Sequence, residues 1–443
     1  MPSPLSFSIH TRSTSTNARL GVVATPHGSF DTPAFMPVGT RGTVKGILPR
    51  DVAATGAQIL LNNTYHLLLR PGPETVKALG GVHRFMGWDR PILTDSGGYQ
   101  AFSMADTNAV DDDGVTFKSI VDGSSVRLTP ERATQVQNDL GPDIIMAFDD
   151  CPPSLPPSPR GSARGEGSGE GHDEPTGNDD NPPPRPDPRL TRTIARDSRR
   201  APYDHAARLT LAAERTIRWL ERCKAAHQRP HDQALFGIIQ GGTDLSMRSR
   251  CITDICSIDL PGYAIGGVAV GEDSAAIATV VRHTAPLMPE AKPRYLMGVG
   301  YERDITAAVC AGIDMFDCVL PTRNGRNANA FTRAGQIRLR NARFALDPEP
   351  IEEGCDCHAC DPAQHAWPVA PFSRAYLRHL FMAQEMLGPI LVTLHNLRHF
   401  QRLMADLRDA IARDDWQGFA RRWPTAAPGL PPGLLPGSAK QRA

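Results

Sequence analysis

The sequence predicts an α/β protein whose main domain is a closed (β/α)₈ barrel of the TIM type, followed by a zinc-binding helical subdomain. Short apolar runs alternate with amphipathic stretches over residues 1–345, and a tight cysteine cluster follows where this alternation ends. Alternating strand and helix patterns indicate a parallel sheet. Seven or eight such units in about 350 residues favour a closed barrel over an open sheet.

The individual elements are expected where the apolar spacing changes. Strands are predicted at 58–61, 92–94, 144–148, 235–239, 263–265, 295–297 and 315–316. Amphipathic stretches between several of them predict helices at 204–227, 273–288 and 303–311. Two further helices are expected beyond the barrel, at 376–387 and 391–413.

Polar residues or glycines directly follow the predicted strands. They are Asn62, Asn63, Asp95, Ser96, Asp149, Asp150, Gln240, Gly241, Gly242, Gly266, Gly267, Gly298 and Asp317. One such residue would be read as a cap or a turn former. Because the carboxyl ends of all strands of a parallel barrel meet at one rim, the repeated pattern instead predicts a single functional site.

Composition excludes several classes of protein. The 443 residues are 40% hydrophobic and 22% charged, and their formal net charge of zero gives no overall attraction to nucleic acid. No apolar run reaches the roughly 18–20 residues needed to span a bilayer. Residues 1–7 lack the basic start and apolar stretch of a signal peptide. We therefore expect a cytoplasmic protein without a membrane segment, whose scattered cysteines are reduced.

The chain divides into four parts. Residues 1–345 form the predicted barrel, interrupted at about 152–201 by a Gly/Pro/Ser-rich insertion with mixed charge. Such a segment buries too little apolar surface to offset the entropy of ordering, so disorder is expected there. Residues 346–423 form the predicted zinc-binding subdomain, and 424–443 a flexible tail.

Three cysteines, Cys355, Cys357 and Cys360, form a C-x-C-x₂-C cluster. Three thiolates around one small volume suit a tetrahedral Zn²⁺ ion that needs one more ligand. The candidates for that ligand are His358, His365, His379, His395 and His399. Four filled positions leave no room for a reactive water, so the predicted zinc is structural.

Two aspartates close apolar runs, where a buried carboxylate needs a partner or a function. Asp95 precedes Ser-Gly-Gly, and Asp317 lies just before a run of arginines. Two carboxylates on one rim suit displacement at a sugar carbon, with one as nucleophile and the other as proton shuttle. The Tyr99 ring could stack on a flat base, and Asp149 with Gln240 could bind a purine-like edge.

A strip of arginines without any acid extends from 323 to 343. Its members are Arg323, Arg326, Arg333, Arg338, Arg340 and Arg343. It is either a solvated loop face or a local phosphate-binding strip. The second interpretation makes the attacked sugar part of a nucleic acid.

These motifs together resemble the bacterial tRNA-guanine transglycosylase (queuine tRNA-ribosyltransferase) family, from about residue 7 to 413. The matching segments are NTYH (63–66), TDSGGYQ (94–100), MAFD (146–149), FGIIQGG (236–242), YAIGGVAVGE (263–272), YLMGVG (295–300) and MFDCVLPTRNGRN (315–327). No single segment is specific, but the set is. The resemblance also implies a (β/α)₈ barrel with a zinc subdomain.

The resemblance implies a role for each matching residue. Asp317 would attack the ribose and form a covalent RNA–enzyme intermediate, and Asp95 would act as general acid and base. The implied base-binding residues are Asp95, Ser96, Tyr99, Asp149, Gln240, Gly267 and Met297. Arg323 and Arg326 would bind RNA. The implied zinc ligands are Cys355, Cys357, Cys360 and His395.

The resemblance also implies the substrates. Cys151, Val270 and Glu272 match the bacterial branch, whose incoming base is 7-aminomethyl-7-deazaguanine. The partner would be a tRNA with a GUN anticodon (aspartate, asparagine, histidine or tyrosine tRNA). The enzyme would replace guanine at the wobble position, in queuosine biosynthesis, as a cytoplasmic homodimer with one structural Zn²⁺ per subunit.

Two rival interpretations use the same residues. A homologous but inactive partner subunit would share the fold, yet this chain keeps both Asp95 and Asp317. A retaining glycosidase acting on free sugars would use the two carboxylates, but the arginine strip and the cysteine cluster would then have no purpose. Exchange of labelled base into tRNA separates these possibilities.

Overall fold

Eight parallel strands form a closed barrel in the computed structural model, which describes residues 4–103, 109–152, 204–361, 363 and 370–437. Around the barrel the strand order is β4, β14, β13, β12, β11, β10, β6 and β5, and a bridge between Val38 and Leu61 closes the ring. Their bounds are β4 Ala34–Pro37, β5 Leu60–Asn62, β6 Ile92–Thr94, β10 Ile144–Met146, β11 Ala234–Ile239, β12 Gly262–Ile265, β13 Arg294–Leu296 and β14 Met315–Cys318. The predicted TIM barrel is confirmed.

Strand β4 is the one barrel strand absent from the sequence prediction. All four of its residues are buried, and it pairs in parallel with β14, for example Phe35 with Phe316. Four residues ending in Pro37 give neither an alternating pattern nor a long apolar run. Sequence periodicity therefore has little to detect there.

Alternate side chains of each strand fill the barrel or face the surrounding helices. In β11, Phe236 and Ile238 belong to the interior cluster, whereas Leu235 and Ile239 pack against the helices. This period of two makes the interior a packed core. Polar side chains at the carboxyl ends of the strands therefore lie directly above this packed apolar core.

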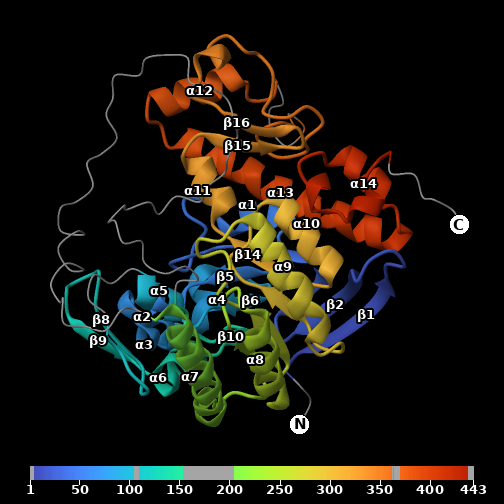
Figure 1. Ribbon diagram of the computed structural model, residues 1–443. Coiled ribbons are helices and arrows are strands. Elements are labelled where there is room, and N and C mark those ends of the chain that lie inside the picture. Colours follow the sequence, from blue (N-terminus) through green and yellow to red (C-terminus); the bar gives the residue numbers. More distant parts are fainter. Residues whose placement is uncertain (1–3, 104–108, 153–203, 362, 364–369, 438–443) are drawn as a thin grey trace, which may run out of the picture.

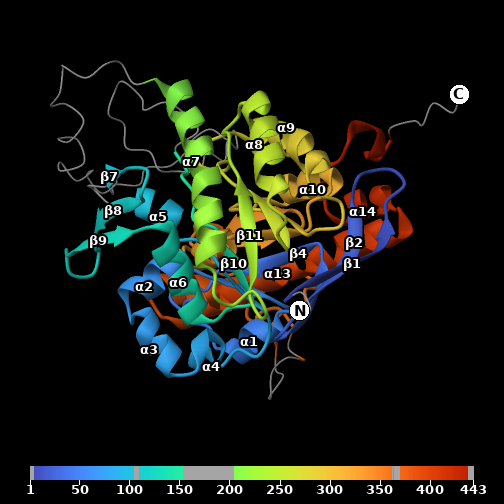
Figure 2. The ribbon, with the colours of Figure 1, turned by 90° about the horizontal axis from the view of Figure 1, so that it is seen from below.

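A three-stranded antiparallel sheet covers the amino-terminal end of the barrel. It consists of β1 (Ser6–Arg12), β2 (Arg19–Thr25) and β3 (Gly28–Thr32). Leu5, Val23 and Phe30 pack into the barrel interior cluster. Figure 2 shows β1 and β2 on the side of the barrel away from the start of α7. This end is therefore closed, and the opposite rim remains for chemistry.

Helices surround the strands (Figure 1). Their bounds are α1 Pro49–Ala54, α2 Thr64–Leu69, α3 Pro73–Ala78, α4 Gly81–Met86, α5 Gly98–Ser103, α6 Pro130–Leu140, α7 His205–Ala226, α8 Leu245–Ser257, α9 Ser274–Thr284, α10 Glu302–Ala311 and α11 Leu320–Arg326, with the 3₁₀ turn η1 at Ala285–Leu287. Asp204, Asp244 and Asp273 cap α7, α8 and α9 by accepting backbone N–H bonds. A small sheet, β7 (Ala109–Val110), β8 (Val115–Lys118) and β9 (Ser125–Leu128), precedes α6.

The C-terminal lobe lies at the top of Figure 1. It contains the hairpin β15 (Asn329–Thr332) and β16 (Gly335–Arg338), η2 (Ala342–Phe344), α12 (Arg374–Met382), α13 (Leu387–Arg413) and α14 (Trp416–Arg422). The long helix α13 joins this lobe to the barrel. Its Gln401 side chain donates to the carbonyl of Phe35 at 3.0 Å, and Arg408 donates to that of Pro33 at 2.8 Å.

Two expectations concern segments outside this core. The predicted disorder of the insertion falls on 153–203, outside the described residues. The segment after 423 was expected to be a flexible tail. As far as 437 it contains the 3₁₀ turns η4 (Ala427–Gly429) and η5 (Pro432–Leu434), and Ala426 and Leu430 are buried. In the described ranges, no helix combines the length and apolar character needed to cross a membrane.

Candidate active site and metal centre

Asp95 follows β6 at the rim and is held entirely by uncharged donors. Oδ1 accepts the backbone N–H of Thr64 at 2.9 Å and of Gly97 at 3.2 Å. Oδ2 accepts the side-chain amides of Asn63 and of Gln100, the latter at 3.0 Å. Gly97 has a φ of +77°, and a Cβ there would lie 3.1 Å from the backbone nitrogen of Tyr65. A glycine is therefore needed to bring this amide onto the carboxylate.

Burial raises the pKa of Asp95 to about 6, and the negative charge of Asp317 adds to the increase. The hydrogen bonds from Asn63 and Thr64 oppose this shift without cancelling it. A carboxyl group with a pKa near neutrality can both release and accept a proton at physiological pH. Asp95 thus has the property expected of a general acid and base.

Asp149 follows β10 and forms a second buried carboxylate site. Its Oδ1 accepts the hydroxyl of Ser96 at 3.1 Å, and its Oδ2 accepts the side-chain amide of Gln240 at 2.6 Å. Burial raises the pKa of Asp149 to about 6. Ser96 is the neighbour of Asp95 in the chain, so the two carboxylates belong to one connected network.

Gln240 and Gly267 lie in contact at the ends of β11 and β12. A Cβ at Gly267, where φ is +61°, would lie 2.2 Å from Oε1 of Gln240. Arg248 on α8 fixes this part of the rim because its guanidinium is fully buried. It donates to the carbonyls of Ile239 at 2.9 Å and Gly267 at 3.2 Å. Backbone and amide groups therefore line this side of the site.

Asp317 is the last polar group of β14. Its Oδ1 accepts the hydroxyl of Tyr295 at 2.6 Å and the backbone N–H of Gly298 at 2.8 Å. Burial raises its pKa, against the effect of both hydrogen bonds. Among the described residues Oδ2 accepts no hydrogen bond, and this oxygen is therefore available to attack an electrophile.

Tyr99 and Met297 stand at the edges of this network. Tyr99 is 48% exposed on α5, and its pKa is raised by burial together with the nearby Cys151 and Glu272. Met297 is half-buried and lies beside Gly266, where a Cβ would be 3.7 Å from its sulfur. An aromatic ring and a thioether beside buried polar groups suit a flat ligand with a polar edge.

Asp150 has a different environment from its neighbour Asp149. Both oxygens of its buried carboxylate face arginines: Arg208 at 2.6 Å and Arg215 at 2.6 Å. Both arginines belong to α7, which follows the insertion. Asp150 therefore ties the end of β10 to α7 and is not free to bind a ligand.

Some arginines of the strip predicted from sequence contact other side chains of the protein. Arg323 and Arg326 lie on α11, directly after β14. Arg333 turns to Asp406 at 3.2 Å and stacks over the Trp423 ring at 4.8 Å. Arg343 stacks over Phe344 at 4.7 Å. Strip arginines therefore include packing residues as well as candidates for RNA binding.

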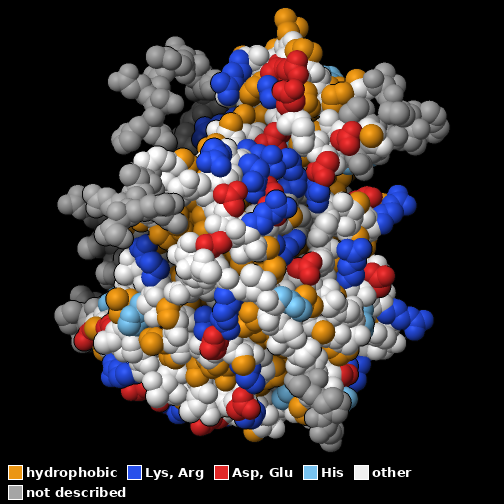
Figure 3. Space-filling model, turned by 90° about the vertical axis from the view of Figure 1, so that its right-hand side faces the viewer, with side chains coloured by type: hydrophobic (Ala, Val, Ile, Leu, Met, Phe, Trp, Pro, Cys, Tyr) orange, Lys and Arg blue, Asp and Glu red, His pale blue; other side chains and the backbone are white. Residues whose placement is uncertain are grey.

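Basic side chains also gather elsewhere on the surface. Figure 3 shows Lys and Arg over the upper half of one side, with Asp and Glu among them. In the C-terminal lobe Arg398 pairs with Asp356 at 2.5 Å, and Arg402 pairs with Glu352 at 3.0 Å. Much of the positive charge of the lobe is thus neutralised within the protein.

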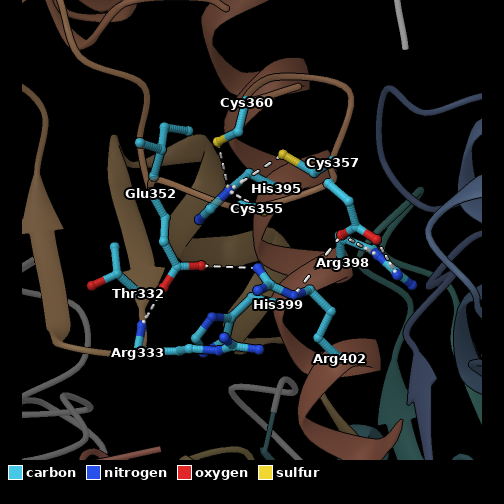
Figure 4. A network of polar contacts seen from close by, with 12 residues as sticks. Thr332, Arg333, Glu352, Cys355, Cys357, Cys360, His395, Arg398, His399 and Arg402 are labelled. Atoms are coloured by element: carbon cyan, nitrogen blue, oxygen red, sulfur yellow. Dashed lines mark hydrogen bonds and ion pairs between the residues drawn. The ribbon is translucent and has the colours of Figure 1, made fainter. Parts of the chain in front are cut away.

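The three cysteines converge on one histidine. The Sγ atoms of Cys355, Cys357 and Cys360 lie 3.6, 3.4 and 3.4 Å from Nδ1 of His395 (Figure 4). Metal–sulfur bonds of about 2.3 Å and metal–nitrogen bonds of about 2.0 Å place the corners of a tetrahedron about 3.5 Å apart. The four buried side chains therefore fit a metal ion.

The other ring nitrogen of His395 lies 2.7 Å from the carbonyl oxygen of Phe331 on β15, which orients the ring. His399, one turn further along α13, faces elsewhere: its Nε2 lies 3.0 Å from a carboxylate oxygen of Glu302. His379 lies on α12, beside the Tyr376 ring. The structure thus brings His395, and neither of these other candidates, to the sulfurs; His365 lies outside the described residues.

Sequence reasoning placed Asn63 at the rim without a specific role, and it assigned no role to Gln100, Tyr295 or Arg248, which also build the site. Asn63 and Gln100 hold Asp95, Tyr295 holds Asp317, and Arg248 holds the rim. One of these residues could have been found from the sequence: Tyr295 in β13 is a polar side chain at a strand position that faces the barrel interior. Arg248 lies within an amphipathic helix and gives no such signal.

The fold and the site define a barrel enzyme with uncompensated carboxylates at its rim and a buried Cys₃His group that could hold a metal ion. The family model described as "Queuine tRNA-ribosyltransferase" matches residues 13–166 and 195–428, which leaves out part of the insertion. A relative of that name from Thermus thermophilus is 47% identical over 95% of this chain and 94% of its own. Those from Acetivibrio thermocellus and Staphylococcus aureus are 47% and 45% identical, with 90% of this chain aligned to 91% and 90% of theirs. The chain belongs to the queuine tRNA-ribosyltransferase family, and it is a transferase.

Proposed function

We propose that this enzyme replaces guanine at the wobble position of GUN-anticodon tRNAs with 7-aminomethyl-7-deazaguanine, as a step of queuosine biosynthesis. The observation that carries the proposal is the pair Asp95 and Asp317, one buried and one half-buried carboxylate on one rim, which neutral donors alone hold in place. A tRNA substrate also agrees with a cytoplasmic enzyme. The target base stands in a single-stranded loop, so little pairing energy opposes its removal from the stack.

The proposed reaction consists of two displacements at C1′ of the ribose. Oδ2 of Asp317 attacks C1′, the bond from C1′ to N9 of guanine breaks, and protonated Asp95 gives its proton to the leaving base. The incoming base then loses its N9 proton to Asp95 and attacks C1′, which releases the Asp317 carboxylate. Two inversions leave the ribose with its original configuration. The raised pKa of Asp95, about 6, suits both proton transfers.

Base recognition is assigned to Asp149, Gln240, Ser96 and the backbone at Gly267, which offer acceptors and donors to the polar edge of a purine. Tyr99 and Met297 are proposed to flank its faces. The roles of these residues rest on their common position at the rim and on the family pattern.

The choice of incoming base is supported by Glu272. Its Oε2 accepts the backbone N–H of Val270 at 2.7 Å, whereas Oε1 is buried and has no hydrogen-bond partner among the described residues. A buried carboxylate oxygen without a partner is unfavourable in the free protein. An aminomethyl ammonium group would satisfy it, and guanine carries no such group.

We propose that the metal is a structural Zn²⁺, because three thiolates and one imidazole are a typical zinc donor set. Replacing His395 with alanine should release the metal, and replacing His399 should not. A complete structural zinc site stabilises isolated peptides by roughly 10–16 kcal/mol. Elemental analysis and thermal unfolding of both variants test this. About one zinc per chain in the His395 variant would refute the assignment.

A homodimer through the C-terminal lobe is supported by its exposed apolar side chains. Leu346 is 94% exposed, Met386 79% and Met382 57%. Such large apolar groups gathered on one lobe favour a protein interface. Sedimentation of the wild type and of a variant with charged residues at Met382 and Met386 tests the assignment.

The decisive experiment uses tRNA labelled in the target guanine. Incubation with 7-aminomethyl-7-deazaguanine should release the label into solution, and the same tRNA with adenosine at that position should not react. A protein that cleaves simple glycosides and leaves tRNA unchanged would contradict the proposal.

A further inference from the structure

A buried pair of polar side chains joins the C-terminal lobe to the barrel. Nε2 of His399 on α13 lies 3.0 Å from Oε1 of Glu302, the first residue of α10. The two side chains are 0% and 7% exposed. Neither belongs to the Cys₃His group or to the network around Asp95 and Asp149. The pair therefore needs an explanation of its own, because the burial of polar groups is unfavourable.

The contact with the carboxylate fixes the His399 ring. Three aromatic rings surround it, those of Phe331, Phe400 and Trp423, with centroids 5.9, 5.5 and 4.9 Å away. Within the described part of the chain, Nδ1 is buried without a hydrogen-bond partner, so Nε2 provides the polar anchor. Apolar residues in place of such a buried pair often give equal or greater stability. Stability alone therefore does not account for the pair, and the geometry that it imposes does.

Glu302 stands at the end of the loop that holds the nucleophile. Four residues before it, the N–H of Gly298 donates to Oδ1 of Asp317 at 2.8 Å. The loop between them packs closely against β14, since a Cβ at Gly300 would lie 2.5 Å from both Cβ and Sγ of Cys318. So close a fit transmits a shift at one end of the loop to the other end. The position of Glu302 thus affects a hydrogen bond that Asp317 accepts.

Helix α13 also contacts the segments on the other side of Asp317. Asn396 donates to the carbonyl of Pro321, four residues after Asp317, at 3.0 Å. Gln401 donates to the carbonyl of Phe35 at 3.0 Å, and Phe35 belongs to β4, which pairs with β14. Polar side chains of one helix therefore reach the β13–α10 loop, the turn after the nucleophile and the neighbouring strand.

We propose that the pair of Glu302 and His399 positions the nucleophile, Asp317. The pair holds the β13–α10 loop so that the Gly298 N–H stays on Oδ1 and Oδ2 faces C1′ of the ribose. The inference rests on the proposed function, in which Oδ2 attacks C1′. Both residues act through Gly298 and are positioning residues. Loss of the contact should lower kcat and leave the KM values for tRNA and for the base unchanged, since a displacement of about 1 Å can reduce a rate by about 10²-fold.

Two substitutions at one position separate the contact from its charge. Glu302→Ala removes the acceptor and should lower kcat at least about tenfold. Glu302→Gln keeps an oxygen that accepts the Nε2–H of His399, so kcat should stay within about threefold of the wild type. A Glu302→Ala variant with the kcat of the wild type would overturn the proposal. Equal losses in the two variants would also overturn it, because the charge and not the contact would then matter.

A second buried histidine–carboxylate pair supplies the matched control. Nε2 of His83 lies 3.0 Å from Oδ2 of Asp143 at the closed end of the barrel. His399→Phe should lower kcat per folded molecule, and His83→Phe should not; an equal fall in both would count against positioning. The Glu302→Ala/His399→Phe double variant leaves no unpaired polar group and should melt near the wild type. Its low kcat would then not result from unfolding.

The pH profile of kcat reports on Asp317 itself. Burial raises the pKa of Asp317, and hydrogen bonds from Tyr295 and Gly298 lower it. Asp95 and Cys318 also interact electrostatically with Asp317. Loss of the Gly298 bond raises this pKa further, so fewer molecules carry the ionised nucleophile at low pH and the acid limb moves to higher pH. The alkaline limb, which follows Asp95, should stay. An unshifted acid limb in the alanine variant would contradict the proposal.

Amide hydrogen exchange tests the pair without turnover. The Gly298 N–H should exchange at least about tenfold faster in Glu302→Ala than in the wild type and in Glu302→Gln. Equal rates in all three proteins would overturn the proposal. Failure of the wild type to replace guanine in tRNA would instead refute the proposed function, and the exchange rate of this amide would still show whether the pair holds the loop.

Discussion

The carboxylates at the two ends of the barrel have different kinds of partner. At the amino-terminal end, Asp314 pairs with the guanidinium of Arg19 at 2.5 Å. Asp143 accepts His27 at 2.8 Å and His83 at 3.0 Å, and the two imidazoles stack with centroids 3.6 Å apart. At the opposite rim, Asp95, Asp149 and Asp317 are held only by amides, hydroxyls and backbone N–H groups.

The pKa values of Asp143 and of the rim carboxylates follow this difference, whereas burial raises the pKa of Asp314 although Arg19 opposes the increase. Hydrogen bonds from its partners, chiefly His83, lower the pKa of Asp143 to about 2 despite its burial. Burial raises the pKa of Asp95 and of Asp149 to about 6. The closed end thus uses an ion pair, Arg19–Asp314, and hydrogen bonds from two imidazoles to hold the structure, while the three rim carboxylates have no cationic partner. A group that must form a bond or move a proton cannot also be neutralised by a permanent ion pair.

The contrast also exists between neighbours in the chain. Asp150 is neutralised by Arg208 and Arg215, whereas Asp149, one residue earlier, faces Ser96 and Gln240. At the end of strand β10 the two side chains leave in different directions. A single peptide unit therefore separates an ion-paired carboxylate from the one that we assign to base recognition.

The strongest way to break the comparison is to remove the charge of Asp317. Asp317→Asn should abolish exchange, by at least about three orders of magnitude, because an amide of nearly the same shape is a poor nucleophile. Binding of tRNA and the melting temperature should change little. Wild type mixed with tRNA and a base analogue should give a protein–RNA band that survives denaturation. The same band from the variant would show that another group is the nucleophile.

The second prediction concerns a substitution that should lower stability and leave activity unchanged, the opposite of Asp317→Asn. Arg19→Gln leaves Asp314 buried without its cation and should destabilise the protein by about 3–5 kcal/mol. Exchange per folded molecule should stay near that of the wild type, because Arg19 lies at the closed end. Arg12→Gln is the control, since Arg12 pairs with Glu290 on the surface and should have little effect. An Arg19 variant that keeps its stability and loses kcat would contradict the division between the two ends.

Sequence predicted the rim better than it predicted the closed end. Asp95, Asp149 and Asp317 directly follow or end apolar runs, and parallel topology brings the ends of such runs together. The cysteine spacing likewise indicated a metal site, although the histidine stayed open among five candidates until the resemblance was considered. These signals are local in the chain, and a reader of the sequence can recognise them.

The closed end depends on contacts between distant residues. Arg19 and Asp314 are separated by 295 positions, and His27 and Asp143 by 116. Neither pair has a spacing or motif that marks it. The short strand β4 escaped detection for a related reason, because four buried residues carry no periodicity. The sequence also could not show which arginines of the strip have partners within the protein, because Arg333 and Asp406 come together only in the folded chain.

The last and smallest effect is the change in the free energy of unfolding when a buried aspartate is replaced by asparagine at a given pH. This change should have opposite signs at the two ends of the barrel. The pKa of Asp143 is about 2 in the fold and about 3.9 when unfolded, so its contribution to stability is present above about pH 4 and disappears as pH falls towards 2. Asp143→Asn should therefore lower the free energy of unfolding by about 2–3 kcal/mol at pH 5 and by much less near pH 2.

For Asp149 the folded pKa of about 6 exceeds the unfolded value. Wild-type stability is then greatest below about pH 4, and part of it is lost as pH rises through 6. Asp149→Asn should raise the free energy of unfolding above pH 7 by up to about 2–3 kcal/mol, with no gain near pH 4, provided that Gln240 turns its amide to match the new side chain. Urea unfolding at pH 2 and pH 5 measures the Asp143 variant, and unfolding at pH 4 and pH 8 measures both variants. Asp254→Asn, at an exposed position of α8, serves as a carboxylate control outside both ends. Stability changes of the same sign for Asp143 and Asp149 at pH 8 would mean that the rim is as well compensated as the closed end.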